Sequence, residues 1–320
     1  MNPFKYIIIG TTSCIKFIIS FIKHFFIGLV TIITFIPKYL IICLFSEKKQ
    51  KELKMEDKII PIIITTLSIT TYLICIFILT RWFVQSERNK KFSDNLNDLS
   101  QIISEEENSD EEYKVPNKIY SNGNYPDDLT FLNVNLDPYI RQNSETVAWL
   151  LVNGTNINYP VVQHKDNNYY LSHNFYKRKS MSGWVFADYR DDFETFNNNT
   201  IIYGHNLINR TMFGQLPKLL NSSWQSNPNY HYIKLSTKTT NSIWQIFSVY
   251  KIKPTTDYLQ SIFNSMSTYQ KFLNTIKNRS AYDFNVDVST TDKIITLSTC
   301  DDTGTKRVAV HAKLINIEDK

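Results

Sequence analysis

Residues 146–163 read TVAWLLVNGTNINYPVVQ, and this stretch decides the fold class of the chain. The runs Thr146–Val152 and Pro160–Gln163 are rich in Val and other residues that favour strands. Between them, Asn153-Gly154 is a turn signal typical of a hairpin, because both residues tolerate positive φ. The stretch therefore predicts a β-hairpin.

Further runs of the same kind follow along the chain. They are Gly183–Ala187, Asn199–Gly204, His231–Ser236, Ser242–Ile252, Lys293–Ser298 and Lys306–Ile317. Three stretches favour helix: Asp137–Glu145, with Asp137 as cap and Pro138 at the first helical position, Met212–Leu220 and Ser265–Lys277. Many short strands with few helices indicate a mainly β fold with helical additions, either a closed barrel or a sandwich.

The N-terminal part has a different character. Residues Ile59–Leu79 contain no charge over 21 residues, which as a helix spans about 31 Å, enough to cross a bilayer. We therefore expect an uncleaved transmembrane helix there. Ile7–Phe45 is also apolar but is interrupted by charges, so it is either a further span, a hairpin or an interfacial helix. The expected organisation is a membrane-associated region (1–80), a polar and acidic linker (81–114) and a globular domain (115–320). The Lys and Arg asymmetry around the span is too weak to decide on which side of the membrane this domain lies.

Composition excludes several functions. Only 8 of 320 residues are Gly, and neither GxxxxGK[ST] nor GxGxxG occurs, so a Gly-rich phosphate loop is not expected. The net charge of +5 gives no reason to propose nucleic-acid binding. Three of the four Cys lie in the apolar N-terminal part, and Cys300 is alone in the remainder. A disulfide within the globular domain and a CxxC motif are thus excluded, and Cys300 is either a packed apolar residue or a nucleophile.

Three residues at predicted strand ends form a chemically sensible set. Cys300 ends TLSTC, His205 ends IIYGH, and Arg307 opens KRVAVHAKL. A thiolate is a nucleophile that benefits from cationic neighbours, His can protonate a leaving amine, and Arg can hold an oxyanion. Taken singly, His205 is better explained as a turn residue and Arg307 as a solvated strand start, and the pair Asp301-Asp302 is better explained as a strand end than as a cation site.

Four motifs, in order, resemble the sortase family. VAWLLVNGTNINYPVVQHKDNNYYLSHNF (147–175) and GWVFADYR (183–190) are similar to class B sortases in particular. NTIIYGHNLINRTMFGQL (199–216) resembles the segment that carries the family's His, and TLSTC with an Arg on the next strand resembles its active-site signature. The resemblance covers about residues 136–317. The loop between Cys300 and Arg307 is shorter than is common in the family, and the N-terminal region is longer and more hydrophobic.

The resemblance implies a mixed β-barrel of the sortase type. It implies Cys300 as nucleophile, His205 as general acid and then base, Arg307 as oxyanion or substrate clamp, and Ser298 and Tyr203 as groove-lining residues. No metal or organic cofactor is implied.

The implied partners are a secreted surface protein with a C-terminal sorting signal, of an Asn-Pro-type or related pentapeptide, and an amine on a peptidoglycan precursor or pilin. The enzyme would lie in the cell membrane of a Gram-positive-type bacterium with its catalytic domain outside. A cysteine peptidase that hydrolyses the same intermediate and a non-catalytic extracellular binding domain are the alternatives; the presence of Cys300, His205 and Arg307 together argues against the second.

Overall fold

The computed structural model describes residues 63, 66–81, 83–84, 87–88, 91, 129–300 and 306–320. The chain forms two compact units, Met1–Trp82 and Phe83–Lys320. In the first unit, residues 66–81 are helical and exposed. Within the described residues, no helix combines the length and the apolarity of a membrane span. The predicted segment Ile7–Phe45 lies outside the described residues, and so does most of the predicted linker.

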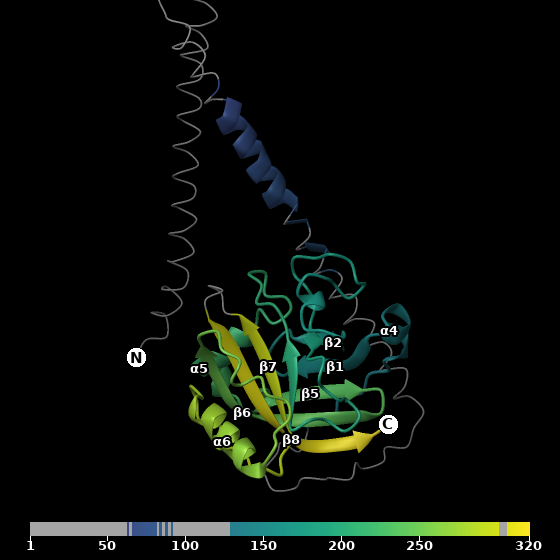
Figure 1. The fold of residues 1–320 in the computed structure, drawn as a ribbon, viewed down its shortest axis with the longest axis vertical. Helices are drawn as coiled ribbons and strands as arrows, with labels where there is room; N and C mark the ends of the chain where they lie inside the picture. The colour runs from purple at the N-terminus through teal and green to yellow at the C-terminus, as the bar shows by residue number, and fades with distance from the viewer. Residues whose placement is uncertain are drawn as a thin grey trace, which may run out of the picture. The chain divides into compact units, whose positions relative to one another are not determined.

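The second unit contains a closed barrel (Figure 1), in which the strands are hydrogen-bonded in the order β1-β2-β3-β4-β7-β8-β6-β5. The strands are β1 (Thr146–Val152), β2 (Asn158–Val162), β3 (Phe186–Ala187), β4 (Asn199–Tyr203), β5 (Tyr232–Thr237), β6 (Thr240–Ile252), β7 (Ile294–Cys300) and β8 (Arg307–Asp319). The pairs β2/β3 and β4/β7 are parallel, and the others are antiparallel. The expected closed mixed barrel is confirmed, and each strand-like run lies on one of these strands.

The hairpin of the opening stretch forms as predicted. β1 and β2 pair antiparallel, with Trp149 opposite Pro160. Gly154 has φ +69°, and a Cβ on it would lie 2.5 Å from Cγ of Tyr230. The turn therefore needs Gly both for its left-handed backbone and for the close approach of the Tyr230 ring.

Helices are few and mostly short. They are α4 (Asp137–Gln142), η1 (Tyr169–Leu171), η2 (Leu216–Leu220), α5 (Ser222–Gln225), η3 (Pro228–Tyr230) and α6 (Met266–Asn278). α6 confirms the helix expected at Ser265–Lys277: Ser265 is its N-cap in a capping box with Thr268.

Two helical predictions need correction. α4 ends at Gln142 rather than Glu145, because Asn143 is extended and turns its amide inward to the hydroxyl of Tyr170 and the carbonyl of Phe175. Its N-cap is Leu136 rather than Asp137.

The predicted helix Met212–Leu220 is wrong over its first part. Met212 has φ 53°, which an α-helix cannot accommodate. Its amide instead donates to the hydroxyl of Tyr159, and its side chain is fully buried. Only Leu216–Leu220 is helical, and it is a 3-10 helix. Tertiary contacts override the local preference here.

The core fills the barrel and the contact between the barrel and α6. Four Trp side chains are buried with less than 2 % exposure, at positions 149, 184, 224 and 244. α6 turns Tyr269, Phe272, Leu273 and Ile276 inward. The barrel is thus a packed core, and chemistry is left to the residues at its strand ends.

Candidate active site

Three strand ends meet at one edge of the barrel. β4 and β7 run parallel with Tyr203 opposite Ser298, so their carboxyl ends lie together. β8 returns antiparallel beside β7, and Cys300 at the end of β7 pairs in register with Arg307 at the start of β8. Figure 1 shows β7 and β8 side by side. The backbone therefore brings the positions of Cys300 and Arg307 directly opposite each other.

His205 follows at the same edge. It lies two residues beyond Tyr203, as Cys300 lies two residues beyond Ser298, and the amide of Gly204 still donates to the carbonyl of Ser298 at 3.3 Å. The parallel register thus continues to the residue before His205. β4 thus brings His205 to the same edge as Cys300 on β7 and Arg307 on β8, which lie about 95 and 102 residues further along the sequence.

The imidazole of His205 is held by a backbone carbonyl. Its Nε2 lies 2.9 Å from the carbonyl oxygen of Leu171, at the end of η1. A carbonyl oxygen can only accept, so Nε2 is the donor and carries the proton. Gly183 makes this arrangement possible: at φ +55°, a Cβ on it would lie 2.9 Å from Cδ2 of His205 and 2.4 Å from the carbonyl oxygen of Tyr170.

The two residues expected to line the groove are both hydrogen-bonded within the domain. Ser298 is buried, and its hydroxyl lies 2.9 Å from that of Tyr258. The half-buried Tyr203 donates its hydroxyl to Oδ2 of Asp188 at 2.9 Å. Burial and the Asp188 carboxylate raise the pKa of Tyr203, so it stays a neutral donor.

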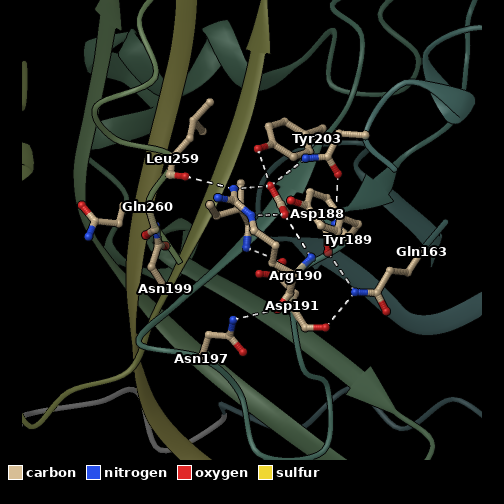
Figure 2. Close-up of polar contacts among 12 residues, drawn as sticks. Gln163, Asp188, Tyr189, Arg190, Asp191, Asn197, Asn199, Tyr203, Leu259 and Gln260 are labelled. Carbon is tan, nitrogen blue, oxygen red and sulfur yellow. Dashed lines mark hydrogen bonds and ion pairs between the residues drawn. The ribbon is translucent and has the colours of Figure 1, made fainter. Parts of the chain in front are cut away.

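An ion pair beside Tyr203 was not singled out by sequence reasoning. Asp188 is fully buried and accepts from Nε and Nη2 of Arg190 at 2.7 and 2.8 Å (Figure 2). Burial alone would raise the pKa of the Asp188 carboxyl, but hydrogen bonds from Arg190, Tyr203 and Asn167 outweigh it and hold the pKa below its usual range. Asp188 and Arg190 lie inside the motif GWVFADYR, and the signal that could have found them is two opposite charges directly after a buried strand.

Among the described residues, no group of three or more His, Cys, Asp and Glu side chains is arranged to hold a metal ion. The chemistry that the strand-end residues offer is that of a Cys, a His and an Arg.

Comparison with known proteins agrees with this geometry. The Sortase domain family matches residues 150–315, which is more than half of the chain. The chain therefore belongs to the sortase family, whose members are cysteine transpeptidases.

Its relatives are sortases of class B. Sortase B of Listeria monocytogenes is 38% identical over 177 residues, which cover 54% of this chain and 71% of the relative. Sortase B of Staphylococcus aureus is 36% identical over 178 residues, covering 55% and 72%. The resemblance to class B sortases that the four motifs indicated is confirmed.

Solved structures support the same assignment. A Staphylococcus aureus sortase B–substrate complex is 35% identical, with a TM-score of 0.53, and covers 57% of this chain and 84% of that one. Clostridium perfringens sortase B is 34% identical, with a TM-score of 0.53, and covers 56% and 98%. The barrel is thus of the sortase type.

Proposed function

We propose that Cys300 attacks the carbonyl of a Thr in the C-terminal sorting signal of a secreted surface protein. The carrying observation is the register that sets Cys300 opposite Arg307 and beside the strand that leads to His205. A cationic neighbour favours the thiolate over the thiol. One similar solved structure, of Staphylococcus aureus sortase B, is described as a complex with substrate, which supports substrate binding by a barrel of this type.

The reaction proceeds in two balanced steps. In the first, the Cys300 thiolate attacks the Thr carbonyl carbon and forms a C–S bond, the peptide C–N bond breaks, and the doubly protonated His205 gives its Nδ1 proton to the leaving amine. In the second, an acceptor amine attacks the thioacyl carbon, passes a proton to His205, and the C–S bond breaks. Because Nε2 of His205 is committed to the carbonyl of Leu171, Nδ1 is the nitrogen that transfers the proton. Arg307 stabilises the negative charge on the carbonyl oxygen.

The acceptor is an amine on a peptidoglycan precursor or a pilin Lys. The same thioacyl intermediate can be resolved by water, so the acceptor is tested by product analysis. Purified enzyme is incubated with a quenched fluorescent pentapeptide of the Asn-Pro type carrying Thr at the cleaved bond, with and without added triglycine as amine. We expect a ligated product with triglycine; hydrolysed peptide alone in excess triglycine would refute the transfer.

The nucleophile is tested by Cys300→Ala. We expect this variant to form no thioacyl-enzyme, as read by intact-protein mass spectrometry, and to unfold at the wild-type temperature. Cys75→Ala is the matched control, because Cys75 lies in the N-terminal unit, and it should retain activity. Retained turnover in Cys300→Ala would show that another residue is the nucleophile.

The enzyme is anchored in the cell membrane with its catalytic domain outside, where a secreted substrate is found. The support is the uncharged stretch Ile59–Leu79, which is long enough to cross a bilayer. A protease added to intact protoplasts of a Gram-positive host should remove a C-terminal tag; a protected tag would place the domain inside.

A further inference from the structure

A network of polar contacts runs between the two strands that end at the active site. It begins at Tyr203, near the end of β4, whose hydroxyl donates to the buried Asp188 (Figure 2). Nε and Nη2 of Arg190 each donate to one of the two carboxylate oxygens of Asp188. Asn167 donates to Asp188 as well, at 2.8 Å, so the carboxylate is fully surrounded by donors.

Arg190 extends this network to a distant part of the chain. Its Nη2 also donates to the carbonyl oxygen of Leu259 at 3.2 Å, as Figure 2 shows. Leu259 lies in the connection between β6 and α6, which is 69 residues further along the sequence. A guanidinium can serve a carboxylate and a carbonyl at once because its five donors have a fixed planar geometry.

Leu259 belongs to an anchored segment, residues 257–261, in which each residue has a hydrogen-bond partner elsewhere in the domain. Asp257 pairs with Arg279, and the Tyr258 hydroxyl lies 2.9 Å from that of Ser298. The Leu259 carbonyl accepts from Arg190. Asn199 donates its side-chain amide to the carbonyl of Gln260 and its backbone amide to the carbonyl of Ser261. Asn199 opens β4 and Ser298 is near the end of β7. The anchored segment is thus fastened to both strands that lead to His205 and Cys300.

The Asp188 carboxylate is buried, whereas the Arg190 side chain is 40% exposed, and the cost of removing the carboxylate from water offsets much of the attraction within this pair. The pair does fix the positions of neighbouring groups. Arg190 holds the Leu259 carbonyl, and Asp188 holds both Arg190 and the Tyr203 hydroxyl. Leu259 in turn is next to Tyr258, which contacts Ser298. Both ends of the network are therefore residues that lie two positions before a candidate catalytic residue.

We propose that Asp188 and Arg190 are positioning residues that hold the anchored segment against β4 and β7 and thereby set the affinity for the sorting-signal peptide, an inference that rests on the proposed function. They do not touch the reacting atoms, so their loss weakens peptide binding and leaves the chemical step intact.

The first test is kinetic. With the quenched fluorescent pentapeptide of the Asn-Pro type, we expect Arg190→Ala to raise KM about tenfold, the effect of losing a hydrogen bond to a charged group, while kcat stays within about twofold. Arg190→Lys keeps a positive charge beside Asp188, so it preserves the fold, but a point charge cannot serve Asp188 and Leu259 together; it should also raise KM. Lys277→Ala is the control, because it breaks an exposed ion pair between Lys277 on α6 and Asp287, and its KM should be unchanged.

The second test needs no substrate. Hydrogen exchange in the full chain should become faster over residues 257–261 in both Arg190 variants and remain at the wild-type rate in Lys277→Ala. Unchanged exchange there, or an unchanged KM in a folded Arg190→Lys variant, overturns the positioning role. If the wild-type enzyme turns over no such peptide, the proposed substrate class fails, and the exchange result alone then decides whether Arg190 holds the anchored segment.

Discussion

At the scale of single residues, the proposed roles of Arg307 and His205 both depend on the geometry of the side chain as well as on its charge. Arg307 stands in register with Cys300, and a planar guanidinium can present two parallel N–H groups to one oxygen, which an ammonium cannot. His205 needs a fixed ring, and the Leu171 carbonyl supplies it.

Arg307→Lys tests this distinction. We expect kcat to fall about 10²-fold, as when an oxyanion donor is lost, because in the proposed mechanism a planar guanidinium stabilises the carbonyl oxygen and a point charge would replace it. Steady-state kinetics with the fluorescent pentapeptide measure this. Arg141→Lys, on the exposed face of α4, should behave as wild type; near-normal kinetics in Arg307→Lys would reduce Arg307 to a structural residue.

Asp191 is a second residue to consider at this scale, because its buried environment predicts how the stability of the domain depends on pH. Its Oδ2 accepts from the amide of Ile201 at 2.7 Å, while Oδ1 is buried and has no hydrogen-bond partner in the described residues. Burial raises the pKa of the Asp191 carboxyl to about 8. The folded state thus keeps a proton that the unfolded state releases from about pH 4 upward, so the stability that this group contributes is lost as pH rises toward 8.

Asp191→Asn replaces the carboxylic acid by a group that stays neutral at every pH. We expect the melting temperature of this variant to fall less between pH 5 and pH 8 than that of the wild type. Differential scanning calorimetry provides the measurement, and Asp192→Asn is the neighbouring control because Thr195 and backbone amides already lower the pKa of Asp192. If the melting temperature of the wild type changed as little with pH as that of Asp191→Asn, the raised pKa of Asp191 would be contradicted.

At the scale of elements, the loop between β2 and β3 supports the His205 ring. η1 presents the Leu171 carbonyl, and the amide of Trp184 donates to the carbonyl of Tyr170 at 2.9 Å. Tyr170 is fixed in turn through its hydroxyl, which donates to Glu145 at 2.5 Å. Gly183 lets these segments approach each other because it carries no Cβ.

Gly183→Ala should disturb this support directly. A Cβ there must displace either η1 or the His205 ring, so we expect kcat to fall at least about tenfold, together with a loss of stability of about 1–3 kcal/mol from the strained backbone. Gly154→Ala is the matched control: it carries the same kind of strain at φ +69°, but the atoms nearest to its Cβ would be those of the Tyr230 ring, away from His205. It should lose stability and keep kcat; equal losses of kcat in both variants would contradict a specific role for Gly183.

At the scale of the whole molecule, the barrel is tied together by a polar network inside its core. His311 on β8 is fully buried, with Nε2 2.9 Å from the Tyr250 hydroxyl and Nδ1 2.8 Å from that of Thr296. Thr296 in turn donates to Asn199, so β8, β6, β7 and β4 are joined. Burial lowers the pKa of His311 to about 3, and the ring is therefore neutral in the folded protein.

Acid should therefore destabilise the domain. Below about pH 6.5 the unfolded chain binds a proton on this His that the folded chain does not, so His311 by itself lowers the free energy of unfolding by up to about 1.4 kcal/mol per pH unit between pH 6.5 and pH 3. Asp191, which keeps its proton in the folded state up to about pH 8, opposes this slope above about pH 4, so the net loss of stability is steepest below pH 4. Urea unfolding at several pH values measures this slope. His311→Gln should flatten it and the half-exposed His173→Gln should not; an unchanged slope in His311→Gln would assign acid sensitivity to other groups.

Much of the fold followed from local patterns. The runs rich in β-branched and aromatic residues located each barrel strand to within a few residues, Asn153-Gly154 located the hairpin, and Ser265 located the start of α6. These features are set by neighbours in sequence, through strand preference, positive φ and capping. Met212 escaped the prediction because the hydroxyl of Tyr159 and a buried position fix its backbone from afar.

The sequence by itself determined which residue types are available for chemistry, and the four motifs determined the family. Only the tertiary structure decided that the positions of Cys300, Arg307 and His205 meet, since a parallel pair β4/β7 joins residues about 95 apart that no local pattern relates. It also decided that Tyr203 is bound to Asp188, that Leu171 orients His205, and that Arg190 reaches Leu259. The physical reason is that hydrogen bonds act over about 3 Å, and only folding brings these distant groups to that distance.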